Sequence, residues 1–172
     1  MSRILIVAEH DGAKLNASTL KCITCAAKIP GAAIDGALLA ADGAAVAAAA
    51  AKGAGVGKVV QIDHPANTES LAAVLAPQVA KVAAGYTHVF GPSTTFGKDV
   101  MPRVAALLGV NQLTDIMAVE SATRFKRPIY AGNAILTLEV PAGTTIVATV
   151  RVASFEAAGD GGSAAVEKVA PG

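Results

Sequence analysis

Apolar runs alternate with longer helix-like stretches through the first two-thirds of the chain. The runs are continuously apolar rather than alternating, which is typical of strands buried on both faces. We expect strands at residues 4–8, 34–39, 58–62 and 87–90. Helices are expected between them and after the last, at residues 16–28, 43–54, 68–84 and 100–108. Strands that alternate with helices predict a mostly parallel sheet with helices on both faces, in a three-layer α/β fold.

The last third of the chain has a different pattern, in which short strand-like segments follow one another closely. They lie at residues 116–120, 128–131, 134–140 and 145–152. Pro141 and Gly143 between the last two segments are typical of a turn, so we expect antiparallel strands added at one edge of the sheet. From Glu156 onward the chain is rich in Gly and Ala. We therefore predict a domain over residues 1–155 and a tail over residues 156–172 that begins a linker.

Composition agrees with one soluble domain and narrows its possible functions. The chain has 172 residues, of which 53% are hydrophobic but only 3% aromatic, so aliphatic side chains must fill the core. The net charge is +1 and the charges are spread out, which does not favour nucleic-acid binding. The sequence shows neither a signal peptide nor a membrane-spanning stretch, so the expected location is the cytoplasm of a bacterial-type cell.

The segment Gly91-Pro-Ser-Thr-Thr-Phe-Gly-Lys-Asp99, here called the 91–99 turn, joins the fourth expected strand to the fourth expected helix. Such junctions bind anions in α/β proteins. The segment departs from a P-loop because five residues separate its glycines and Asp99 stands where a hydroxyl is needed. Asp99 would also satisfy the donors that a phosphate uses. A capped turn and an anion site both remain open, and the candidate anion ligands are Thr94, Thr95, Gly97 and Lys98.

Three other motifs suggest chemistry less strongly. Cys22 and Cys25 have the spacing of a dithiol, and a thiol oxidoreductase would use them; their expected place inside a helix favours core packing instead. Glu9, His10 and Asp11 follow the first strand, where adjacent residues cannot all converge on one metal ion, so a loop-fixing role is favoured and no metal site is expected. The glycines of residues 53–58 follow a helix and precede a strand, the wrong order for a dinucleotide-binding motif.

Longer motifs, in order along the whole chain, resemble the amino-terminal domain of the electron transfer flavoprotein alpha subunit. They are Ile4-Leu-Ile-Val-Ala-Glu-His-Asp11, Leu15-Asn-Ala-Ser-Thr-Leu20, the stretch 93–108, Gln112-Leu-Thr-Asp115, Arg127-Pro-Ile-Tyr-Ala-Gly-Asn-Ala134 and Thr149-Val-Arg151. The resemblance implies an adenine-nucleotide-hydrolase-like fold. It also implies a non-catalytic scaffold domain that pairs with a beta subunit, with Arg127, Tyr130 and Arg151 as candidate contacts.

The family implies the wider role. Its members are FAD-containing alpha/beta heterodimers that carry electrons from flavoprotein dehydrogenases, such as the acyl-CoA dehydrogenases of fatty acid β-oxidation, to a quinone-linked oxidoreductase. FAD lies mostly in a second alpha domain, whose segments this sequence does not contain, and AMP lies in the beta subunit. Neither cofactor is therefore expected in this chain, and the isolated domain is open to self-association. The alternative is an autonomous nucleotide- or phosphate-binding protein that uses the 91–99 turn.

Overall fold

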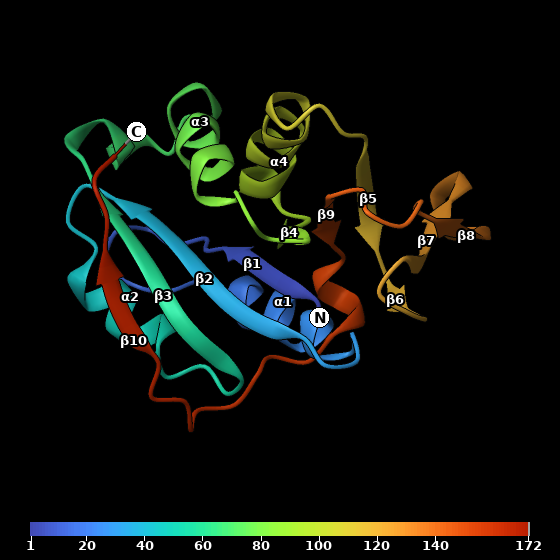
Figure 1. Ribbon diagram of the computed structural model, residues 1–172, viewed down its shortest axis with the longest axis horizontal. Helices are drawn as coiled ribbons and strands as arrows, with labels where there is room; N and C mark the ends of the chain where they lie inside the picture. The colour runs from blue at the N-terminus through green and yellow to red at the C-terminus, as the bar shows by residue number, and fades with distance from the viewer. Residues whose placement is uncertain (172) are drawn as a thin grey trace.

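In the computed structural model, which describes residues 1–171, seven parallel strands form a central layer with helices on both faces (Figure 1). The strand order is β10-β3-β2-β1-β4-β9-β5. The strands are β1 (Arg3–Val7), β2 (Ala33–Ala40), β3 (Val56–Asp63), β4 (His88–Pro92), β5 (Gln112–Ile116), β9 (Ile146–Val150) and β10 (Ala165–Lys168). The helices are α1 (Ala17–Ala27), α2 (Ala44–Ala50), α3 (Ala72–Val82) and α4 (Thr95–Leu107). The predicted fold class is confirmed.

Strand β1 shows why a continuous apolar run forms the centre of this sheet. Leu5 and Val7 pack on the side of α3 and α4, whereas Ile4 and Ile6 pack on the side of α1. Successive side chains point to opposite faces of a strand, so both sets must be apolar when both faces are covered. Burying each of these side chains stabilises the fold by about 1.5–3 kcal/mol. Within residues 1–171, the helices are too short or too polar to cross a bilayer.

Two predicted helix starts change in the structure, and the second helix ends at Ala50 rather than at residue 54. Helix α1 begins as expected, with the Asn16 side chain accepting a hydrogen bond from the Ser18 N–H at 2.9 Å. The third helix does not begin at residue 68, because Pro65–Glu69 form a 3₁₀ turn that ends at Ser70 in a left-handed conformation, with φ +49°. The fourth begins at Thr95 rather than at residue 100. The polar and glycine residues at the start of the fourth helix concealed its first turn, because the start was predicted from the spacing of apolar residues.

An antiparallel sheet of three strands, here called the small sheet, lies beyond β5 at one end of the molecule (Figure 1). It consists of β6 (Ala118–Val119), β7 (Arg124–Ile129) and β8 (Ala134–Glu139). The predicted segment 116–120 covers the end of β5 and all of β6, and the segment 128–131 overlaps only the end of β7. Antiparallel strands were thus predicted correctly, but they form their own sheet.

The prediction that residues 145–152 continue this antiparallel group is wrong. Strand β9 lies between β4 and β5 and is parallel to both. All five of its residues are buried, as a central parallel strand requires. The turn at Pro141 and Gly143 therefore leads the chain back into the main sheet rather than into a hairpin.

Part of the Gly- and Ala-rich tail also joins the main sheet. Strand β10 pairs in parallel with the outer edge of β3. Two ion pairs support it, from Lys58 Nζ to Glu167 Oε2 at 3.1 Å and from Lys168 Nζ to Asp63 Oδ2 at 3.2 Å. Four exposed residues give a weak strand signal, which is why composition alone indicated only a linker.

His88 fastens the small sheet to the main sheet. It begins β4, is 3% exposed, and its Nε2 lies 2.7 Å from the carbonyl oxygen of Ala122, in the loop between β6 and β7. A carbonyl can only accept, so Nε2 carries the proton. The ring also contacts Phe90 and Phe125 edge-on, with centroids 5.6 and 6.4 Å away. Burial lowers the pKa of His88.

The junction between β4 and α4 is tight, and two glycines permit it. A Cβ on Gly97 would lie 1.7 Å from the carbonyl oxygen of Pro92, which belongs to the backbone and cannot move aside alone. A Cβ on Gly91 would lie 2.7 Å from the sulfur of Met101 in α4. Both glycines of the 91–99 turn therefore allow α4 to pack closely against β4.

Gly97→Ala should destabilise the protein by roughly 3 kcal/mol, because the new methyl group forces α4 away from β4. Urea unfolding measures the change. Gly159→Ala is the matched control, since a Cβ there meets nothing within 4 Å. Equal stability of the two variants would contradict the packing role of Gly97.

Stability should fall as the pH drops below 6.5, the ordinary pKa of histidine. The pKa of folded His88 is lowered, so the unfolded chain binds the proton first, and each pH unit in this window removes up to about 1.4 kcal/mol until the folded ring titrates. Urea unfolding between about pH 7 and 5 would show this slope in the parent and not in His88→Gln. His64→Gln, at an exposed histidine, should keep the slope.

Candidate functional site

The carboxyl ends of β1 and β4 form the first candidate site. The chain runs from β1 to β2 on one side, while β4 pairs with β1 on the other. Connections that leave neighbouring strands in opposite directions create a crevice, and open α/β sheets bind their ligands in such a crevice. The 91–99 turn lies at this position.

The turn itself is shorter than a phosphate-binding loop. Gly91 and Pro92 still belong to β4, and α4 starts at Thr95, so only Ser93 and Thr94 connect them. Thr94 caps α4, its side-chain oxygen accepting a hydrogen bond from the Gly97 N–H at 3.4 Å. The structure brings Thr94 and Gly97 together, while Thr95 and Lys98 lie exposed on the first turn of α4. An anion site at these four residues stays a prediction.

Glu9, which the sequence indicated only as a loop-fixing residue, supplies a carboxylate at this crevice. Its Oε2 accepts hydrogen bonds from Ser18 Oγ at 2.5 Å and from Thr94 Oγ1 at 3.1 Å. Asp99, which we expected at the helix start, is instead the fifth residue of α4. The acidic residue that meets the cap of α4 therefore comes from the end of β1. Its signal in the sequence was its position directly after the first strand.

The neighbours of Glu9 fix the loop, as their sequence position suggested. His10 contacts the Leu39 carbonyl oxygen through Nε2 at 2.9 Å, and its Nδ1 accepts from the Gly12 N–H at 2.9 Å. Asp11 Oδ1 accepts from two backbone N–H groups, at 2.9 and 2.7 Å, and these bonds lower the pKa of Asp11. Among the described residues, His, Cys, Asp and Glu side chains do not form a group of three or more that could hold a metal ion.

Cys22 and Cys25 lie inside α1 and are fully buried. Burial raises the pKa of both thiols. A redox-active cysteine needs a lowered pKa and access to its partner, so the surroundings of these two residues favour core packing.

The small sheet is the second candidate site, because it holds two of the three predicted partner contacts. Tyr130 follows β7 and is 79% exposed. Arg127 lies on β7, and its Nε is buried without a hydrogen-bond partner among residues 1–171. Arg151 lies elsewhere, after β9, and its guanidinium donates to Asp115 Oδ2 at 3.0 Å. The structure thus places Arg127 on β7, Tyr130 in the short turn that follows β7, and Arg151 in an ion pair.

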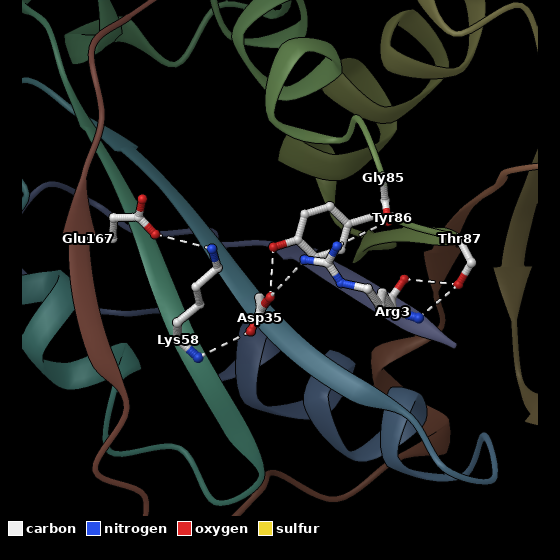
Figure 2. Close-up of polar contacts among 7 residues, drawn as sticks. All are labelled: Arg3, Asp35, Lys58, Gly85, Tyr86, Thr87 and Glu167. Carbon is white, nitrogen blue, oxygen red and sulfur yellow. Dashed lines mark hydrogen bonds and ion pairs between the residues drawn. The ribbon is translucent and has the colours of Figure 1, made fainter. Parts of the chain in front are cut away.

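A polar cluster at the opposite, amino-terminal edge of the sheet ties four strands together (Figure 2). Asp35 Oδ2 accepts from the Tyr86 hydroxyl at 2.7 Å and lies 4.0 Å from the Arg3 guanidinium, which covers the Tyr86 ring at 4.6 Å. Burial and Asp35 raise the pKa of Tyr86. Lys58 donates its backbone N–H to Asp35 Oδ1 at 3.2 Å and its ammonium group to Glu167.

A cavity of about 440 Å³ opens beside this cluster, between α3 and the outer strands. Arg3 and Lys58 line it, but both already have carboxylate partners. Their pairing, and their distance from the carboxyl edge where such folds bind ligands, favour a stabilising role for the cluster.

Comparison with known proteins agrees with this architecture. Residues 4–172 match the model of the electron transfer flavoprotein domain. The chain is 48% identical to the electron transfer flavoprotein subunit alpha of Pseudomonas aeruginosa, over 96% of this chain and 53% of that protein. It is 46% identical to the subunit alpha of Bradyrhizobium diazoefficiens, over 96% and 52%. It is 41% identical to the mitochondrial subunit alpha of Dictyostelium discoideum, over 96% and 48%.

The resemblance noted in the sequence motifs is therefore confirmed over nearly the whole chain. The chain spans about half the length of the curated relatives it matches. On these matches, the chain belongs to the electron transfer flavoprotein family and is similar to its alpha subunits.

Proposed function

We propose that this chain is the scaffold domain of an electron transfer flavoprotein alpha subunit, which pairs with a beta subunit in an FAD-containing electron carrier. The match of nearly the whole chain to about half of each alpha subunit carries the proposal. In this role the domain does no chemistry itself. It supports the flavin-binding part of the assembled protein and takes its place beside the beta subunit.

The crevice at the carboxyl ends of β1 and β4, where the chain connections leave in opposite directions, is here called the switch point. Its residues do not fit a bound FAD or AMP. A dinucleotide or nucleotide phosphate would need free N–H groups at a helix N-terminus and a glycine-rich loop around it. Here Asn16 and Thr94 cap the two helices, and the Glu9 carboxylate faces Thr94. The negative charge of the Glu9 carboxylate would repel a phosphate bound in the same crevice. These contacts support the placement of both cofactors outside this chain, and the autonomous nucleotide-binding alternative is not favoured.

The small sheet is the surface that we assign to the beta subunit. Beside Tyr130, the side chains of Ile135 and Leu136 on β8 are 59% and 38% exposed. Ile135 and Leu136 are consecutive on β8 and point to opposite faces of the strand, so both faces of this outer strand expose an apolar side chain that a partner can cover. Strand β8 is also the outer strand of its sheet, so one of its edges is free to accept backbone hydrogen bonds.

The backbone before β8 supports the same assignment. Tyr130, Ala131 and Gly132 all have positive φ, of 50°, 54° and 93°. This conformation is unfavourable for a tyrosine, and strained residues of this kind concentrate at functional positions. Tyr130 is also 79% exposed, so a partner can cover its ring. Arg127 lies nearby on β7 and is partly exposed, although its Nε is buried, so only the accessible part of its side chain is available to that partner.

Tyr130→Asp and Ile135→Asp should each weaken association with the beta subunit of the same organism by about 30-fold or more, as expected for loss of an interface anchor. Titration calorimetry with purified beta subunit measures the affinity. Leu71→Asp is the matched control, because Leu71 is 54% exposed but lies at the start of α3. Unchanged affinity in both small-sheet variants would rule out this surface.

The purified chain should be colourless after desalting and should gain no flavin absorbance when FAD is added. A flavin spectrum that survives desalting would contradict the proposed absence of a cofactor site.

The isolated chain should self-associate, and mixing it with the beta subunit should suppress this self-association, because the beta subunit then covers the same apolar surface. Light scattering after size exclusion measures both states. A monomer that does not bind the beta subunit would contradict the scaffold role.

A further inference from the structure

The crevice between β1 and β4 holds an anion that belongs to the protein itself. Glu9 lies two residues beyond the end of β1 and is half-buried. One oxygen of its carboxylate, Oε2, accepts from the hydroxyl of Ser18 in the first turn of α1 and from that of Thr94, the cap of α4. A single oxygen therefore joins the starts of two helices that lie on opposite faces of the sheet.

The backbone of Glu9 is fixed as firmly as its side chain. Its N–H donates to Thr19 Oγ1 at 2.9 Å, and its carbonyl oxygen accepts from the Asn16 N–H at 2.9 Å. Ser18 and Thr19 are only 6% and 3% exposed, so the first turn of α1 encloses the residue. These contacts fix the backbone from which the carboxylate extends, and the bonds to Ser18 and Thr94 hold the carboxylate itself.

The partial charges of the two helix starts explain why a carboxylate is favourable at this position. The N-terminus of a helix carries partial positive charge, which an acidic side chain in the first turn commonly compensates. The first turns of α1 and α4 lie wholly within the described residues and hold no acidic side chain. Glu9 is a carboxylate from outside both helices, and it is bonded at both starts. It lies where other α/β proteins bind a phosphate.

We propose that Glu9 is an internal oxyanion that takes the place of a phosphate at the switch point of this fold and locks α1 to α4. Its two hydroxyl donors, Ser18 and Thr94, form a small-oxyanion site that the protein fills with its own side chain. Removal of the carboxylate opens this site to a free oxyanion small enough to enter, such as formate or inorganic phosphate. This inference does not depend on the proposed partner or cofactor.

Chemical rescue tests the inference with the full chain. The melting temperature of Glu9→Ala should lie several degrees below that of the parent. Formate or inorganic phosphate should raise the melting temperature of this variant by about 3 °C relative to chloride at the same ionic strength. The parent should respond to these anions no more than to chloride. Glu9→Gln should lose stability without recovery, because its neutral amide still fills the space. Thr94→Val combined with Glu9→Ala should abolish the recovery, since one donor is then missing.

Asp99→Ala is the matched control, because Asp99 is an exposed acidic residue of α4 outside the crevice. It should show little loss and no anion-specific recovery. If Glu9→Ala does not fold in chloride, circular dichroism in formate or phosphate decides: folding supports the internal-oxyanion role and failure to fold overturns it. Equal responses of Glu9→Ala and the parent would also overturn it. Recovery by AMP but not by phosphate at equal concentration would assign a nucleotide site and reject the small-oxyanion proposal.

Discussion

The burial of the central strands on both faces is the constraint on which the rest of this structure depends. Because β1 and β4 must place apolar side chains in two cores, helices have to cover each side of the sheet. Right-handed connections then send α1 and α4 to opposite faces. The crevice between the two helix starts is therefore a consequence of the core, and it exists whether or not a ligand uses it.

Local patterns predicted the central part of the fold because burial there leaves a strong signal. Continuous apolar runs located β1 to β4, and Asn16 correctly marked the start of α1. The same reasoning did not place β9, since a strand's neighbours in a sheet depend on contacts distant in sequence. Nor did it find β10, whose four residues are exposed and too few to show a pattern.

The candidate site was harder to predict for a related reason. The bond between Glu9 and Thr94 joins residues 85 positions apart, so no motif around either residue contains it. Asp99 was expected at the N-terminus of α4 because the start of the helix was predicted five residues too late. Tyr130 and Arg127 were selected through family resemblance. The structure shows that Tyr130 is exposed and that Arg127 Nε lacks a hydrogen-bond partner among the described residues, and their role as partner contacts stays a prediction.

Strand β10 has a consequence for the behaviour of the protein in solution. It covers the outer edge of β3, and a sheet edge left open is a template for pairing with other chains. The two ion pairs at this strand lie near the surface, where dissolved salt screens charges. The cover is thus weakest at high ionic strength. The pairing of β10 with β3 is therefore in part an electrostatic property, although the core of the domain is mostly aliphatic.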